Sequence, residues 1–197
     1  MKRIIAIIGI VILLGASGAW AKTRYLTNVG DLAPHSIGIP LTEVAKGGTA
    51  PTKASLGTTP TVQGLLFDAT DELYQIQFQV PDCWNEVSDI TFDLYVVLYQ
   101  AETAGDSIAF TADYVSVTAE ADAVTKTSTN ITTTELVVAS CAGEGCLYKV
   151  VLTLDYDDTD NPLAKEDVVV AEIHRTNVTN VGGVLLIAVD AHFDPKL

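Results

Sequence analysis

Strict alternation of apolar and polar residues constrains this fold more than any other feature of the chain. Residues 74–80 read YQIQFQV, so Tyr74, Ile76 and Phe78 alternate with glutamines. Successive side chains of a β-strand point to opposite faces, so this pattern predicts a strand with one face in a core and one in water. Pro81 follows at once and ends the strand.

Further apolar rows follow this stretch along the chain. They lie at residues 90–98, 108–118, 131–139, 147–156, 167–175 and 184–193. With a strand beginning near Val62, they give about eight strands separated by turns, and no convincing amphipathic helix lies between them. We expect the last two to form a terminal hairpin and the Thr-rich stretch at 131–139 to be a sheet edge.

The predicted fold class is all-β: a single antiparallel β-sandwich of the jelly-roll kind. An immunoglobulin-like sandwich is the alternative, since both architectures are built from short strands with frequent turns. The jelly roll is favoured because the chain lacks a Cys…Trp…Cys framework with immunoglobulin spacing.

The N-terminus has the order of a secretory signal peptide. Lys2 and Arg3 precede an apolar run from Ile4 to Leu14, and Ala19-Trp20-Ala21 offers small residues for cleavage after residue 21. We therefore expect residues 1–21 to be removed and the protein to be secreted, either extracellular or at the cell surface. No later apolar run is long enough to span a membrane after cleavage.

Residues 22–61 differ from the rest in composition. They are rich in Gly, Pro, Thr and Ala and have no aromatic residue after Tyr25. We interpret them as an extended N-terminal arm with one short strand near Ser36–Ile39, ahead of a sandwich domain at residues 62–197. Such an arm docks either on its own domain or on a neighbouring molecule, and a linker without a role of its own is the alternative.

The chain is acidic, and this narrows the range of partners. It has 11 Lys and Arg against 25 Asp and Glu, a formal net charge of −14. A polyanion repels nucleic acid and anionic membrane surfaces, so neither is an expected partner.

Two of the three cysteines predict a disulfide. Cys141 and Cys146 flank Ala-Gly-Glu-Gly between two expected strands, and an oxidising compartment favours their pairing at the tip of a hairpin. Cys83 is left over in that arrangement. Pairings of Cys83 with either of the other two stay open, because spacing alone does not fix connectivity.

Two short motifs carry a family resemblance. Val80-Pro81 with Trp84, and Ile173-His174-Arg175 with Gly183-Val184-Leu185-Leu186, resemble uncharacterised jelly-roll or β-sandwich proteins of phage and environmental microbial genomes. The resemblance covers residues 62–193. It implies a building block of particles or surface structures, and it brings no catalytic residue.

An acidic loop is the candidate metal site. Five oxygen-bearing side chains fall within seven positions: Asp155, Asp157, Asp158, Asp160 and Asn161. Calcium takes six to eight oxygen ligands and accepts them from one flexible loop, although this loop lacks the EF-hand order. The alternative is a solvated turn in which Asp and Asn bind their own backbone. No other cofactor is expected.

Nothing in the sequence predicts catalysis. The histidines lie in no nucleophile motif, and Asp190, His192 and Asp194 on one strand face indicate a strand end in water rather than a metal site. We therefore do not expect an enzyme. Asn130 and Asn177 begin candidate glycosylation sequons.

Aromatic residues offer a candidate ligand site. Tyr95 and Tyr99 share the outward face of one expected strand with Val97 between them, and Trp84 lies in a loop. Such rings can stack on sugars. A patch covered by a neighbour is favoured over a sugar platform for the Tyr-Val-Tyr row, and a central strand buried on both faces would explain the row as well.

The sequence leaves two candidate functions, of which the first is favoured. The first is a secreted structural or assembly subunit of an extracellular filament, surface layer or virion-like particle, forming a homo-oligomer through the N-terminal arm and a sheet edge. The alternative is a secreted carbohydrate-binding module with structural calcium.

Overall fold

The regular structure of the described residues consists of β-strands. The computed structural model describes residues 35–41, 50–68, 73–121, 126–133, 136–139, 141–176 and 181–196, so the predicted signal peptide lies outside them. In these ranges the strands are β1 (His35–Ile39), β2 (Thr52–Leu56), β3 (Val62–Phe67), β4 (Leu73–Gln79), β5 (Ile90–Leu98), β6 (Ser107–Ile108), β7 (Phe110–Val117), β8 (Thr129–Thr132), β9 (Leu136–Val137), β10 (Leu147–Leu154), β11 (Val168–Arg175) and β12 (Val184–Phe193). In that part of the chain, no helix is long and apolar enough to cross a membrane.

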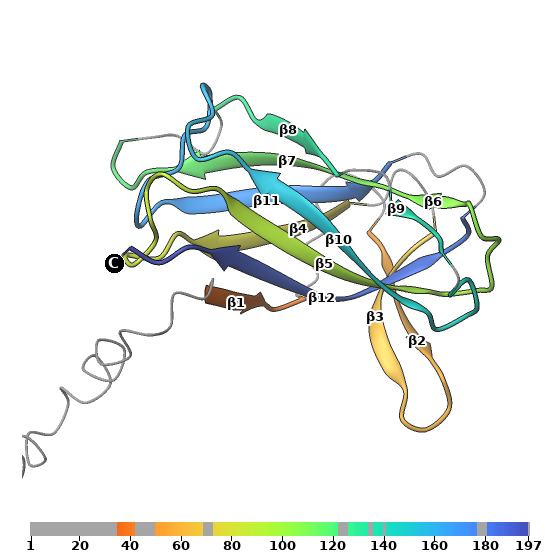
Figure 1. The fold of residues 1–197 in the computed structure, drawn as a ribbon. Helices are drawn as coiled ribbons and strands as arrows, with labels where there is room; N and C mark the ends of the chain where they lie inside the picture. The colour runs from red at the N-terminus through yellow and green to blue at the C-terminus, as the bar shows by residue number, and fades with distance from the viewer. Residues whose placement is uncertain are drawn as a thin grey trace, which may run out of the picture. The chain divides into compact units, whose positions relative to one another are not determined.

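Two antiparallel sheets form the layers of a jelly-roll-like β-sandwich (Figure 1). The six-stranded sheet has the order β10-β5-β12-β3-β2, and β1 pairs with β12 beside this path. The four-stranded sheet has the order β4-β11-β7-β8, and β6 pairs with β9. The predicted fold class is confirmed.

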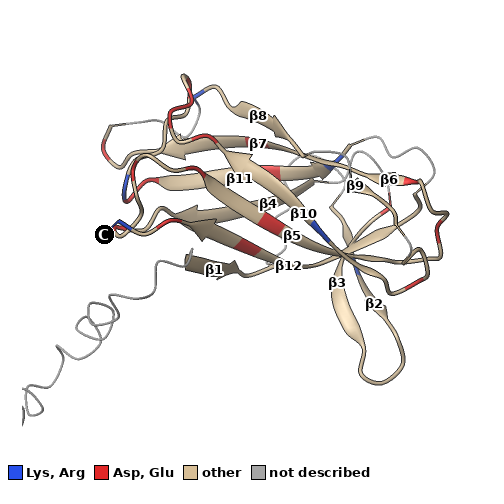
Figure 2. Cartoon of the chain, in the orientation of Figure 1, with Lys and Arg blue, Asp and Glu red and all other residues tan. Residues whose placement is uncertain are grey.

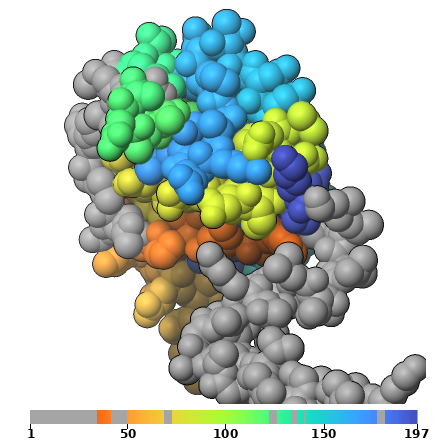
Figure 3. Space-filling model, turned by 90° about the vertical axis from the view of Figure 1, so that its left-hand side faces the viewer, coloured from red at the N-terminus to blue at the C-terminus, as the bar shows by residue number. Residues whose placement is uncertain are grey.

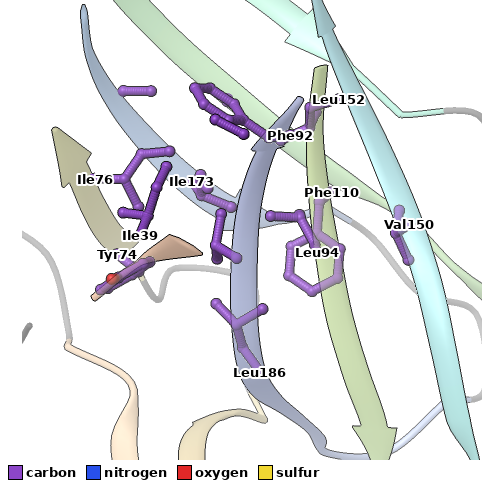
Figure 4. Close-up of a cluster of buried hydrophobic side chains, with 14 of the residues drawn as sticks. Ile39, Tyr74, Ile76, Phe92, Leu94, Phe110, Val150, Leu152, Ile173 and Leu186 are labelled. Carbon is purple, nitrogen blue, oxygen red and sulfur yellow. The ribbon is translucent and has the colours of Figure 1, made fainter. Parts of the chain in front are cut away.

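The core lies between the inward faces of the two sheets (Figure 4). Tyr74, Ile76 and Phe78 of β4 are buried, whereas the intervening Gln75 is half-buried and Gln77 is exposed, as the alternation predicts. Phe78 meets Phe92 of β5 edge to face, with ring centroids 5.2 Å apart. Burying each such ring stabilises the fold by roughly 1.5–3 kcal/mol.

The expected terminal hairpin of β11 and β12 is wrong, because the two strands lie in different sheets. Each carries one inward row, and opposite sheets let both rows face the same core. The buried Arg175, at the end of β11, stabilises the connection between the two sheets through hydrogen bonds. Its Nη1 donates to the carbonyl oxygens of Phe67 (2.9 Å) and Gly182, and its Nη2 donates to that of Val181 (2.6 Å).

The strand expected at 131–139 is divided into two strands with different partners. β8 pairs with β7 at the edge of the four-stranded sheet, which confirms the expected edge for this part, and β9 pairs with β6. Thr133 lies between them and is buried. Its Oγ1 accepts a hydrogen bond from Phe110 N, and its own N donates to Phe110 O, both at 2.9 Å. These bonds hold Thr133 against the start of β7.

Parts of the predicted arm are strands of this same sandwich. β1 pairs with β12 from His35 opposite Phe193 to Ile39 opposite Val189, and β2 pairs with β3 along its whole length. In Figure 3 the orange atoms of the β1 region form one surface with the sandwich. The boundary expected between residues 61 and 62 therefore falls at the start of β3, at the tip of the hairpin that β2 and β3 form.

Cys141 and Cys146 form the expected disulfide. The loop that they close lies against the end of β5, where Gly145 N donates to Leu98 O (2.9 Å) and Leu98 N donates to Cys146 O (3.0 Å). It is not a hairpin tip, because the flanking strands β9 and β10 have different partners. The Cys83 thiol is free and exposed.

Candidate functional site

The outward face of the six-stranded sheet changes from apolar to polar along its central strands. Neighbouring residues of β10, β5 and β12 form four rows, set by the strand register, about 7 Å apart along the strands. The rows are Leu147, Val97 and Leu185; Lys149, Tyr95 and Ala188; Val151, Asp93 and Asp190; and Thr153, Thr91 and His192.

The hairpin of β2 and β3 packs over the apolar end of this face. Leu66 of β3 forms a buried cluster with Val97 and Leu185, and the half-buried Ala54 and Leu56 of β2 pack against it. Val97 is only 4% exposed as a result. The patch predicted on this strand is therefore covered, but by the chain's own hairpin rather than by a neighbouring molecule.

The polar end of the face is organised around Asp93, which is 5% exposed. Its Oδ2 lies 2.9 Å from Lys149 Nζ and 3.0 Å from His192 Nε2. The hydrogen bond and the negative charge of Asp93 raise the pKa of Lys149, so its ammonium group stays protonated. In Figure 2, acidic segments on β5 and β12 flank this part of the sheet and a basic segment lies on β10.

Tyr95 stands one row from Asp93 and is half-buried. Lys149 lies beside it on β10, and on β12 its neighbour is the small Ala188. An aromatic ring next to fixed hydrogen-bonding groups combines an apolar surface with polar anchors, as small-ligand sites do. We call Tyr95, Lys149, Asp93, Asp190 and His192 the polar face.

Tyr99 does not belong to the same platform as Tyr95. It packs against the Leu66 cluster and lines a hollow of about 720 Å³ on the other side of the covered Val97. The row of two tyrosines expected from the sequence is therefore interrupted by the hairpin.

Trp84 cannot serve as a ligand platform, which corrects the sequence-based expectation. Its side chain is fully buried, and its Nε1 donates to Ser88 O at 3.0 Å. It also forms an isolated β-bridge with Pro195. Trp84 is therefore a core residue at one end of the sandwich.

Within the acidic loop, two of the five candidate ligands are occupied by structural bonds. Asn161 is fully buried; its Oδ1 accepts from Ser116 N (3.3 Å) and its Nδ2 donates to Thr127 O (2.9 Å). Asp158 Oδ1 accepts from Thr129 Oγ1 and Asn161 N, both at 2.8 Å. Burial alone would raise the pKa of Asp158, but these hydrogen bonds outweigh it and lower the pKa.

The other three candidates, Asp155, Asp157 and Asp160, lie on the exposed side of the loop. A side-chain hydrogen bond to the Asp155 carboxylate stabilises the protonated carboxyl group of Asp157 and so raises the pKa of Asp157. In the described ranges, no group of three or more His, Cys, Asp or Glu side chains is placed to share a metal ion. Calcium binding by this loop stays a prediction.

The outward face of the four-stranded sheet is polar around Asp113 and His174, carries a patch of valines beyond them (Val115, Val117, Val168 and Val170), and holds one of the two sequons. Exposed Asn130 donates from Nδ2 to Asp113 Oδ1 (2.8 Å), and His174 Nε2 lies 3.7 Å from Asp113 Oδ2. Asn177 lies outside the described residues. The paired rows of β4, β11 and β7 put no Phe, Tyr or Trp on this face, so it lacks the pairing of a large aromatic ring with polar groups that is present around Tyr95.

Sequence reasoning missed Asp93 and Lys149 and placed His192 at a strand end in water. A signal for Asp93 was available, since a carboxylate inside the apolar strand ITFDLYVVL must find partners. The partners themselves come from β10 and β12, which only the sheet order brings together.

Comparisons with known proteins give structural likeness only. No family model matches the chain, and no curated protein does. Among solved structures, the chain is similar to a xylan-binding module, CBM15 (12% identity, 84% of this chain and 100% of that chain covered, TM-score 0.42), and to CBM28, a module specific for non-crystalline cellulose (12%, 74% and 82%, TM-score 0.37). It is also similar to a putative sugar-binding protein from Bacteroides thetaiotaomicron (15%, 83% and 88%, TM-score 0.35).

These values assign neither a family nor a ligand to this chain. The sandwich that the sequence resemblance implied is present in the structure. A phage or environmental-genome origin has no support from the comparisons.

Proposed function

We propose that this protein is a secreted carbohydrate-binding module and that the polar face is its binding surface. The observation that carries the proposal is that Tyr95 lies beside Lys149, whose partner Asp93 is in the next row and contacts His192 of the row beyond. The alternative hypothesis from the sequence thereby moves ahead of the assembly subunit. The proposed role is binding without catalysis.

The chemistry of a sugar matches the groups on this face. A sugar ring has an apolar C–H surface, which suits Tyr95, and a rim of hydroxyl groups, which suits a charged donor and acceptor. Asp93 and Lys149 hold each other at 2.9 Å on neighbouring strands, so little side-chain freedom is lost when a ligand binds. A rigid sheet therefore supports an affinity that free surface side chains would not.

The pairing of β1 weakens the hypothesis of an assembly subunit. It needed the strand near Ser36–Ile39 to pair with a neighbouring molecule, whereas β1 pairs with β12 of its own chain. Export remains part of the proposal, supported by the signal-like N-terminus and by the disulfide, since disulfides persist in oxidising compartments.

Affinity electrophoresis of the protein in gels containing neutral soluble polysaccharides tests the function. We expect at least one polysaccharide to retard the protein, and Tyr95→Ala to weaken that affinity about tenfold, the equivalent of ~1.4 kcal/mol. The control is Gln77→Ala, an exposed position on β4 in the other sheet, which should bind like the original protein. The proposal is wrong if no polysaccharide retards the protein or if Tyr95→Ala binds unchanged.

A further inference from the structure

A groove lies beneath the tip of the hairpin of β2 and β3, on the outward side of the six-stranded sheet. Its volume is about 370 Å³. Its apolar lining comes from the hairpin and from the sheet: Leu56, Val62, Val97, Leu147 and Ile187.

Two of these side chains are unusually open to water for their size. Leu147 is 58% exposed and Val62 is 40% exposed, although Leu147 is paired with buried Val97 and Val62 with half-buried Leu56. A single exposed Leu or Val is ordinary on a protein surface. Two that face one groove from different elements leave an apolar surface that a small ligand can cover.

The groove is continuous with the polar face. Leu147 and Val97 form the row next to Lys149 and Tyr95, so about 7 Å along the strands separates them. A molecule held by Tyr95 and Lys149 can therefore place a substituent in the groove without leaving the sheet.

Size and charge narrow the occupant. The volume is near the lower end of the range for small-molecule sites and is too small for a strand or helix of another protein. Glu144 lies at the groove, and the chain carries a net charge of −14, so a fatty acid or another carboxylate is disfavoured. An uncharged aromatic ring is small enough for this volume and is not repelled by the negative charge.

We propose that this groove binds an uncharged aromatic ring attached to a sugar that is held on the polar face. The proposal rests on the proposed function, because the sugar brings the ring to the groove. It extends that function by naming aryl-substituted glycosides and glycans as the preferred ligands.

Titration calorimetry with paired glycosides tests the proposal. The probes are the 4-nitrophenyl and methyl β-glycosides of glucose, xylose and mannose, measured on the full secreted chain. We expect the 4-nitrophenyl glycoside of the sugar that binds to have an affinity at least tenfold higher than its methyl counterpart. Val62→Ser should remove most of this gain, and the matched control Val87→Ser, a 68% exposed valine away from the groove, should keep it.

The outcomes separate the two proposals. If no glycoside and no polysaccharide binds, the proposed function fails and this inference fails with it. If a sugar binds but its methyl and 4-nitrophenyl glycosides bind equally, or if Val62→Ser keeps the gain, the groove proposal is overturned and the function stands. Light scattering that shows dimers dissociated by Val62→Ser would also overturn it, since a second copy would then occupy the groove.

Discussion

At the scale of single residues, a buried polar side chain stabilises the connection from β11 in one sheet to β12 in the other. Arg175 joins the end of β11 to the segment that leads into β12 and to the end of β3, all through carbonyl oxygens. A guanidinium group presents several donors in one plane, so it can satisfy three carbonyls that no single apolar residue could.

Arg175→Met should lower the free energy of unfolding by about 3 kcal/mol, because several buried carbonyl oxygens lose a charged donor. Urea unfolding with the disulfide intact measures this loss. Glu86→Gln is the control; its ion pair with Lys165 (2.7 Å) lies at the surface, where ion pairs contribute little, so a much smaller loss is expected. Equal losses in the two variants would contradict the role given to Arg175.

Asp158 should make stability depend on pH. Its pKa is lower in the folded state than in the unfolded chain, so its contribution is present above the unfolded value of about 3.9 and is lost as pH falls through the folded value. Urea unfolding at a series of pH values should show the difference between the original protein and Asp158→Asn shrinking below about pH 4. A difference that stays constant with pH would count against this assignment.

At the scale of elements, the hairpin of β2 and β3 is the feature that shapes the outward face. It can bend over β12 because Gly64 has no side chain at the crossing. A Cβ there would lie 2.2 Å from the carbonyl oxygen of Leu186. The hairpin buries the apolar row around Val97 and leaves the polar face open, so it separates the two halves of the sheet.

Gly64→Ala should displace the hairpin from the sheet, because the added methyl group meets backbone that cannot move aside. We expect a lower melting temperature and stronger fluorescence of an apolar dye as Val97 and Leu185 become exposed. Gly143→Ala is the control, since its Cβ would meet nothing within 4 Å. Unchanged melting of Gly64→Ala would show that the hairpin does not need this close approach.

At the scale of the whole molecule, the N-terminal segment contributes to the sandwich itself. Ile39 of β1 is buried in the core, and Tyr74 Oη donates to Pro40 O at 3.1 Å. Self-association through an arm and a sheet edge stays a prediction, but β1 and β2 have partners in their own chain.

A chain that begins at residue 62 should be less stable than one that begins at residue 34 and should self-associate more. The shorter chain lacks β1 and β2, so it exposes an edge of β3 and the apolar row around Val97, and exposed edges promote pairing. Melting curves and light scattering over a range of concentrations compare the two chains. If both melt alike and stay monomeric, residues 34–61 are not part of the stable sandwich.

The local pattern of the sequence was enough to predict the all-β class, the position of β4 and the Cys141–Cys146 disulfide. Alternation of the kind seen at residues 74–80 depends only on the geometry of a single strand, and the cysteine spacing only on a short loop. Each prediction therefore needed no knowledge of distant parts of the chain.

The partners of each strand, and with them the candidate site, were decided by the tertiary structure alone. A strand pattern is the same whichever sheet receives the strand, so β11 and β12 looked like a hairpin although they lie in opposite sheets. Asp93 meets Lys149 and His192 across sequence distances that no local signal spans. The hairpin that hides Val97 and the burial of Trp84 arise from packing, which determines whether an aromatic or apolar side chain meets a ligand or the core.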